Sequence, residues 1–271
     1  MRFSLLAAAL FSVSFGANAQ GGQTPEGWQF TVGAGTLFSP TYEGDDDYVL
    51  SLLPNLKLEY QDKFFASVQD GFGYNLINTD TVRAGPIGRI RFSRDEDGGQ
   101  PFAVTGEETT DLIGLGTVDT TFEVGGFLAY SINRLELGAE LRQGVNGHNG
   151  LVFDATARLS GRYQQNGPPV IWSLGPRLRI VDESYNSAYF SIDADQSLAS
   201  GLAQFAAGGG VYSYGFGATA VLPIGKRGSG WSLVGIVGYD RLAGDAVDAP
   251  LVVERGSPNQ ATVGLFLSKT F

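Results

Sequence analysis

The sequence predicts an all-β fold, an antiparallel transmembrane β-barrel of about twelve strands, with ten strands as the alternative. Three observations lead to this prediction. Segments that alternate between apolar and polar residues recur along the chain, 39 of the 271 residues are glycine, and no apolar run of 18 residues follows the amino-terminal segment. Strands of such a barrel alternate lipid-facing apolar with lumen-facing polar side chains, which keeps mean hydropathy near zero, and here it is −0.01.

The amino terminus is expected to be a secretory signal that covers residues 1–19. Arg2 supplies positive charge, Leu5 to Phe15 form an apolar run, and Ala17 and Ala19 give the small-x-small pattern that signal peptidase cleaves. The apolar run is shorter than the roughly 20 residues that a helix needs to cross a bilayer, which disfavours a membrane-spanning helix. Residues 20–271 are then expected to form a single barrel domain.

Alternation with a period of two gives the expected strands in chain order. In the first strand, Trp28, Phe30 and Val32 share one face, and in segment 151–164 apolar residues at odd positions alternate with mostly polar ones at even positions. Segment 187–193 shows the least alternation, and omitting it leads to the ten-strand alternative. The expected strands are 28–37, 48–60, 63–76, 80–93, 119–132, 134–145, 151–164, 169–181, 187–193, 207–224, 230–242 and 259–271.

Charged residues recur on the polar faces of these strands. In a barrel these faces meet inside, where side chains of opposite charge can pair and fill a narrow lumen. We therefore expect a lumenal charge network of mixed sign. Its predicted members are Lys57, Glu59, Arg83, Arg89, Arg91, Glu136, Glu140, Arg142, Asp154, Arg158, Arg162, Arg177 and Arg179.

The expected strands also assign each connection to one side of the membrane. With both termini in the periplasm, odd-numbered strands run outward, and most long connections fall outside, as is usual for these barrels. The long segment 94–118 is the exception, because this count of strands puts it in the periplasm. The predicted external connections are 39–47, 165–169, 193–206 and 244–259, and the predicted periplasmic ones are 61–62, 94–118, 145–150, 182–186 and 225–230.

The composition excludes several classes of function. The net charge is −10, whereas nucleic-acid binding depends on basic patches, so no nucleic-acid partner is expected. The chain has no cysteine and one histidine, so thiolate and histidine-based metal sites are not expected, and no cofactor motif is present.

Two features of the sequence are considered as possible functional sites. His148 lies in the turn sequence "VNGHNG" and is predicted to be a solvated turn residue rather than a catalytic base. The acidic run from Glu43 to Asp47 is predicted to be an exposed loop, with binding of calcium or of cationic compounds as the alternative, although its spacing is not that of an EF-hand. With no nucleophile and base in a recognisable arrangement, we do not expect an enzyme.

The stretch "YDRLAGDAVDAP" places three aspartates within nine residues. Asp240 is expected at the end of a strand, and Asp245 and Asp248 in the loop that leads to the last strand. Three acids without a histidine or another metal ligand do not define a site. The sequence leaves open whether Arg241 and Asp245 hold this loop over the barrel mouth.

Six segments, in order along the chain, carry a family resemblance. They are "SPTYEGDDD" followed by "LLPNLKLEY", "AGPIGRIRFSRDED", "LIGLGTVDTTFEVGGFLAY", "LRQGVNGHNGLVFD", "GPRLRIVDESYNSAYFSI" and "YDRLAGDAVDAPLVVERGSPNQATVGLFLSKTF". Together they resemble the MipA/OmpV family of Gram-negative outer-membrane proteins. A departure is "SAYFSIDADQS", where the family more usually continues with tyrosine, phenylalanine, glycine and valine. The last residue, Phe271, resembles the aromatic signal by which the barrel assembly machinery recognises outer-membrane proteins.

The resemblance implies a scaffold in the outer membrane, surrounded by lipids and lipopolysaccharide, without catalytic residues. Its periplasmic face would bring a lytic transglycosylase together with a penicillin-binding protein in cell-wall biogenesis. Segment 94–118 is the expected docking surface. The alternative is a narrow channel or a ligand-binding porin-like protein, which the charged polar faces favour.

Overall fold

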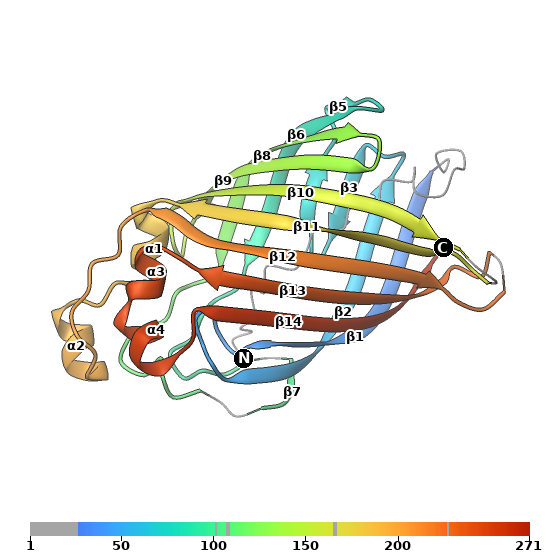
Figure 1. The fold of residues 1–271 in the computed structure, drawn as a ribbon. Helices are drawn as coiled ribbons and strands as arrows, with labels where there is room; N and C mark the ends of the chain where they lie inside the picture. The colour runs from blue at the N-terminus through green and yellow to red at the C-terminus, as the bar shows by residue number, and fades with distance from the viewer. Residues whose placement is uncertain (1–26, 101, 107–108, 165–166, 227) are drawn as a thin grey trace.

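A computed structural model describes residues 27–100, 102–106, 109–164, 167–226 and 228–271. The predicted signal segment and its cleavage site lie outside these residues. Those described form a closed antiparallel β-barrel, which confirms the predicted fold class (Figure 1). Its twelve ring strands are β1 (Trp28–Pro40), β2 (Tyr48–Tyr60), β3 (Phe64–Ser67), β4 (Gly71–Tyr74), β6 (Val82–Arg91), β8 (Thr121–Ile132), β9 (Leu135–Val145), β10 (Leu151–Tyr163), β11 (Val170–Val181), β12 (Gly210–Pro223), β13 (Trp231–Leu242) and β14 (Asn259–Thr270).

The barrel closes where the first strand meets the last. β1 pairs with β2, with Trp28 opposite Tyr60, and with β14, with Thr31 opposite Thr270. We call the end of the barrel that holds these residues the terminal end, and the opposite end, where β1 finishes at Pro40, the cap end. The remaining elements are β5 (Ile77–Asn78), β7 (Ala103–Thr105) and the helices α1 (Glu183–Phe190), α2 (Ala194–Ser200), α3 (Asp245–Asp248) and α4 (Pro250–Arg255).

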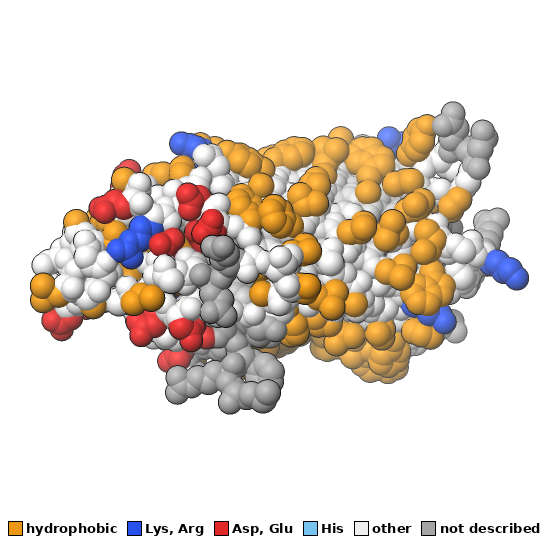
Figure 2. Space-filling view, turned by 90° about the horizontal axis from the view of Figure 1, so that it is seen from below, with side chains coloured by type: hydrophobic (Ala, Val, Ile, Leu, Met, Phe, Trp, Pro, Cys, Tyr) orange, Lys and Arg blue, Asp and Glu red, His pale blue; other side chains and the backbone are white. Residues whose placement is uncertain are grey.

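The outer surface of the barrel is a belt of apolar side chains. Along β8, Phe122, Val124 and Leu128 are about half exposed, whereas Glu123 between them is buried inside. The same alternation on the other strands leaves apolar groups around the barrel and collects charged ones mainly at the cap end (Figure 2). Apolar side chains outside and polar ones inside are the arrangement that a lipid bilayer requires. No helix in the described part of the chain is long and apolar enough to cross a membrane.

Two of the predicted strands are wrong, although the count of twelve is right. The predicted strand 63–76 is a hairpin of two short strands, β3 and β4, because Gly71 takes a left-handed conformation (φ +78°) and Ser67 Oγ accepts the Asp70 N–H at 2.7 Å. The predicted strand 187–193 lies mostly in helix α1, which Asp182 caps by accepting the Tyr185 N–H. One strand gained and one lost leave the number unchanged.

The direction of every strand between these two errors is the reverse of the prediction. Segments 94–118, 145–150 and 182–186 lie at the cap end, opposite the termini, and residues 167–169 lie at the terminal end. All long connections of the described chain therefore gather at the cap end, as Figure 1 shows. The prediction that segment 94–118 lies on the same side of the barrel as the termini is therefore wrong.

The long connections pack into a cap that closes one end of the barrel. One apolar cluster forms around Tyr185 and Phe190 of α1, and a second around Leu112, Leu202 and Leu251, all of which are buried. Burying such side chains provides the main stabilisation of a folded segment. The loops of the cap end thus form a plug with its own small core.

Among the described residues, the strand pairing of the barrel wall is interrupted near the cap. β3 and β4 have four residues each, so the β3–β4 hairpin reaches only part of the height of its neighbours. Above the hairpin, β2 pairs with β7 at Leu50 and Ser51, and residues 89–91 of β6 pair with β8 alone. The interior therefore lies close to the surface at this point.

Candidate functional site: a charged pocket inside the barrel

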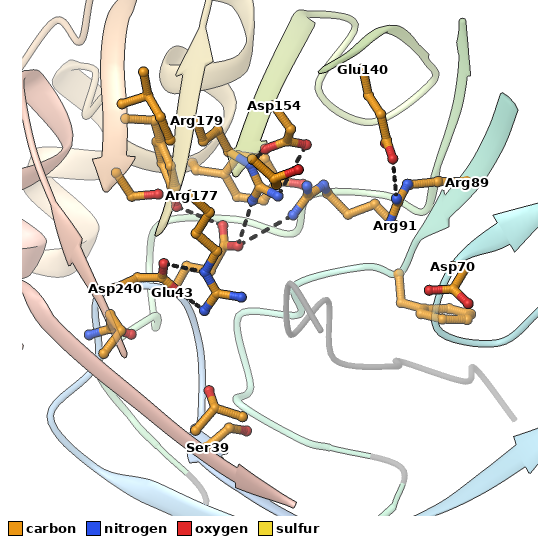
Figure 3. A pocket seen from close by; sticks show the side chains of 18 of the residues that line it. Ser39, Glu43, Asp70, Arg89, Arg91, Glu140, Asp154, Arg177, Arg179 and Asp240 are labelled. Atoms are coloured by element: carbon orange, nitrogen blue, oxygen red, sulfur yellow. Dashed lines mark hydrogen bonds and ion pairs between the residues drawn. The ribbon is translucent and has the colours of Figure 1, made fainter. Parts of the chain in front are cut away.

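A pocket of about 260 Å³ lies inside the barrel below the cap. Its described lining contains equal numbers of arginines and carboxylates, seven of each. The described lining therefore carries charges of both signs in equal number, set among apolar side chains (Figure 3). These side chains are Arg83, Arg89, Arg91, Arg94, Arg158, Arg177, Arg179, Glu43, Asp70, Asp95, Glu136, Glu140, Asp154 and Asp240.

The cap side of the pocket is held by a chain of alternating charges on adjacent strands. Glu123 of β8 accepts Arg91 Nε and Arg142 Nε, each at 2.8 Å. Arg142 also donates to Asp154 at 2.5 Å, and Asp154 accepts Arg179 Nε at 2.8 Å. The alternating faces of five strands, β6 and β8 to β11, place these groups side by side, because inward residues of neighbouring strands share one surface.

Glu43 reaches into this cluster from the loop between β1 and β2. Its carboxylate lies 3.4 Å from Arg91 and 3.6 Å from Arg179, and it accepts the hydroxyls of Tyr212 at 2.6 Å and Tyr185 at 3.2 Å. Burial raises the pKa of the Tyr185 hydroxyl well above its usual range, so this group stays a donor. Glu43 was predicted to lie in an exposed acidic loop, and this prediction is wrong because the arginines draw the carboxylate inward.

Asp45 in the same loop is also buried. Its side chain accepts the Thr41 hydroxyl and the Asp47 N–H. Burial raises the pKa of Asp45 to about 7, and the nearby charges of Asp47 and Asp111 act in the same direction. Only Asp46 and Asp47 of the run remain exposed, so the loop is a folded part of the cap.

His148 is buried at the cap end, and its prediction as a solvated turn residue is wrong. The turn bends the ring inward through left-handed residues at Asn146 and Asn149. His148 Nδ1 accepts the Gly150 N–H at 3.0 Å, so Nε2 carries the proton and donates to Glu123 at 3.2 Å. Both ring nitrogens are engaged and the ring does not line the pocket, so His148 orients Glu123 and offers no free base.

The terminal side of the pocket holds a second set of ion pairs. Arg83 lies 2.6 Å and Arg158 3.4 Å from the carboxylate of Glu136, and Arg89 lies 2.9 Å from Glu140. Glu140 also accepts Arg142, which joins the two sets. The arginines of β6 and β10 therefore face the two acids of β9 that lie between them in the wall.

The other predicted lumen residues are split between the interior and the surface. Arg177 makes a two-pronged pair with Asp240, with Arg177 Nε 2.6 Å from Oδ1. Lys57 and Glu59 pair at 2.9 Å on the inner face of β2. Arg162 is exposed at the terminal end of β10 and does not line the pocket.

Some residues of the site were absent from the prediction. Glu123 and Asp240 occupy the polar faces of their strands, so the alternation used for the other residues could have identified them. Glu43 and Asp70 come from a loop and a turn, and strand periodicity contains no signal for them. In the described chain, no three His, Asp or Glu side chains are placed to hold a metal ion.

The stretch from Tyr239 to Pro250 holds the cap to the barrel. Asp240 points inward to Arg177, whereas Arg241 and the Tyr239 hydroxyl both donate to Asn259 Oδ1 at 2.7 Å. Asp245 accepts the Gly208 N–H at 2.6 Å. These contacts tie both ends of the α3–α4 connection and join it to the segment that follows α2.

Comparison with known proteins gives a family match and distant structural matches. The family model described as "MltA-interacting protein MipA" matches residues 32–271. Of the curated proteins compared with the chain, none matches. The COG4313 outer membrane channel from Pseudomonas putida F1 is 14% identical, with a TM-score of 0.41, and the alignment covers 92% of this chain and 97% of that one. Pseudomonas aeruginosa OprD is 12% identical with a TM-score of 0.36, and the alignment covers 92% of this chain and 68% of OprD. Pseudomonas putida OprB is 10% identical with a TM-score of 0.38, and the alignment covers 82% of this chain and 59% of OprB.

Proposed function

The chain belongs to the MltA-interacting protein MipA family, and from this premise we propose that it is an outer-membrane barrel whose pocket binds small polar solutes. The observation that carries the proposal is the charge-lined pocket between the barrel wall and the cap. Small-molecule sites are concave and few per protein, and barrel mouths are common places for them. With the termini in the periplasm, the cap end faces the outside of the cell.

The cap favours a solute-binding pocket over an open channel. Residues 94–100 of the cap contribute to the lining of the pocket, where Arg94 Nη1 donates to the carbonyl of Tyr189 at 2.6 Å and Gln100 donates to the carbonyl of Thr41. We take these residues, together with the apolar clusters of the cap, to restrict passage along the barrel axis. A solute therefore enters a closed pocket, and its release depends on movement of the cap or passage by the short β3–β4 hairpin.

Conductance in planar bilayers tests this proposal. We expect the full barrel to show little or no conductance, and a variant in which residues 95–100 are replaced by a two-residue Gly-Ser link to conduct. The control variant Arg162→Ala changes an exposed charge outside the pocket and should behave like the full barrel. A large, steady conductance of the unmodified barrel would overturn the proposal of a closed pocket.

The family description supports a second candidate function, a scaffold for murein enzymes. The printed words "MltA-interacting" refer to a lytic transglycosylase, and a penicillin-binding synthase would be the second partner. Because segment 94–118 lies at the cap end, docking would have to use the short terminal-end turns, such as Asn133–Arg134. Capture of a lytic transglycosylase by the barrel should then be lost when these turns are altered and kept when residues 110–117 are shortened. The reverse result would contradict docking at the terminal end.

A further inference from the structure

One carboxylate of the pocket has an oxygen with no hydrogen-bond partner. Asp70 lies in the turn between β3 and β4, is 7% exposed, and lines the pocket. Its Oδ1 atom is buried and receives no hydrogen bond. In Figure 3 Asp70 stands apart from the arginine and carboxylate pairs, on the side of the pocket away from Asp240.

The hairpin holds Asp70 in this inward position. The Asp70 N–H donates to Ser67 Oγ at 2.7 Å, and a Cβ atom on the next residue, Gly71, would lie 2.2 Å from the Gly88 carbonyl oxygen, so the backbone fits tightly against β6. Phe65 of β3 points into the same pocket and meets Phe127 edge to face, with ring centroids 5.9 Å apart. The Asp70 carboxylate thus lines a pocket that also contains these two aromatic rings.

Two further acceptor oxygens line the same pocket without a partner. Asn75 donates through its amide nitrogen to the carbonyl of Asp62, and Gln100 donates in the same way to the carbonyl of Thr41. These donor contacts fix the orientation of both amides, and their oxygens, Asn75 Oδ1 and Gln100 Oε1, remain buried and unbonded. The pocket therefore presents three acceptors that need hydrogen-bond donors.

The neighbouring arginines do not donate a hydrogen bond to Asp70 Oδ1. Arg158 interacts with Asp70 through electrostatic attraction, but its guanidinium lies against Glu136 at 3.4 Å. Arg83 pairs with the same Glu136 at 2.6 Å. A buried carboxylate that lacks a hydrogen-bond donor is costly, and in native proteins such a group is usually satisfied by water or a ligand.

From these contacts we infer that Asp70 is the recognition point for an ammonium group, so the pocket takes a small solute that carries a primary amine. An ammonium donates hydrogen bonds and accepts none, so it can supply the donor that the unbonded Asp70 Oδ1 lacks. Its positive charge also complements the Asp70 carboxylate, for which the described part of the chain shows no salt bridge. This inference rests on the proposed solute-binding function and names the chemical class of the solute.

Calorimetry on the full barrel in detergent tests the inference with 1,4-diaminobutane as the probe. We expect the diamine to bind, and 1,4-butanediol and butanoate, which match its carbon chain, to bind at least tenfold more weakly. Asp70→Asn should lower the affinity for the diamine roughly tenfold to a hundredfold, because a charge-assisted hydrogen bond is lost. Asp70→Glu should keep part of the affinity, and Asp80→Asn, which changes an exposed acid at the terminal end, should have no effect.

Coupling of the diamine to the unmodified barrel gives a second measurement that does not depend on a variant folding. A water-soluble carbodiimide activates carboxylates, and an amine then displaces the urea leaving group to form an amide. Peptide mass spectrometry should find an Asp70 adduct whose yield saturates with diamine concentration, whereas the adduct on the exposed Asp80 should rise without saturation. Equal binding by the barrel and its Asp70→Asn variant would overturn the role of Asp70 while leaving the pocket as a solute site. A barrel that binds the diol or butanoate as well as the diamine would overturn the amine class, and open conductance would instead contradict the proposed function.

Discussion

Neutralising Glu123 should destabilise the barrel more than any other single change in its charge network. The Glu123 side chain is 1% exposed and accepts Arg91 Nε and Arg142 Nε at 2.8 Å and His148 Nε2 at 3.2 Å. In Glu123→Gln the amide nitrogen must face one of these three donors. Two arginines would also lose one of their compensating charges, and Arg91 would keep only Glu43 while Arg142 would keep Glu140 and Asp154.

The magnitude follows from burial. Removing one partner of a buried ion pair costs about 3–5 kcal/mol, because the remaining partners lose a charge that water cannot replace. A matched control is Glu59→Gln, which removes the partner of Lys57 from a pair whose side chains are 19% and 28% exposed. Pairs that water reaches are worth about 1 kcal/mol or less.

The assay is reversible urea unfolding of the barrel in detergent, followed by tryptophan fluorescence. We expect the free energy of unfolding to fall by about 3–5 kcal/mol in Glu123→Gln and by about 1 kcal/mol or less in Glu59→Gln. Equal losses in the two variants, or a loss below about 1 kcal/mol for Glu123→Gln, would refute the argument that burial sets the strength of this network.

Three further predictions concern the loop, the wall and the last residue. The pKa of Asp45 is raised in the folded state to about 7, so the stabilisation it provides is fully present below its usual value near 4 and is lost as pH rises through about 7. Hydrogen exchange in residues 41–47, corrected for intrinsic rates, should be at least about tenfold slower at pH 5 than at pH 8 in the native chain, and Asp45→Asn should remove this difference. Gly175→Ala should prevent folding to the heat-modifiable form, because a Cβ there would lie 1.8 Å from the Ala157 carbonyl oxygen, whereas Gly235→Ala, with no atom within 4 Å, should fold normally. Phe271→Ala should slow assembly in cells yet leave unfolding in detergent almost unchanged, since the ring is 68% exposed and its main contact is Lys269 Nζ at 4.5 Å; a large loss of stability would contradict a role limited to assembly.

Local periodicity explains which parts of the fold could be predicted. A strand alternates its two faces along its own sequence, so the barrel class, most strand positions and the inward faces follow from residues such as those of 151–164. The same alternation predicts that Arg142, Asp154 and Arg179 point inward, but it does not say which groups they meet. Their partners lie on other strands, and pairing depends on the register of the sheet.

The parts of the fold that alternation did not predict are turns and helices. Their structure depends on contacts between residues that are far apart in the sequence. Segment 63–76 alternates like one strand, yet the turn at Gly71 divides it, and the residues of α1 form a helix because Tyr185 and Phe190 are buried against the strand ends and α3. The hairpin adds one strand to the predicted set and the helix removes one. The strands that lie between them in the sequence therefore run in the direction opposite to the predicted one. A local error therefore moved a loop of 25 residues from one end of the molecule to the other.

The sequence by itself determined that the chain alternates into a barrel with an apolar outside and a charged inside. Only the tertiary structure decided that Glu43, Asp70 and His148 belong to the interior, because their positions are set by a loop, a hairpin turn and a tight turn. The physical reason is that alternation is a property of neighbouring residues along one strand. Burial of a turn side chain depends instead on the arginines, carboxylates and aromatic rings that other strands bring to it.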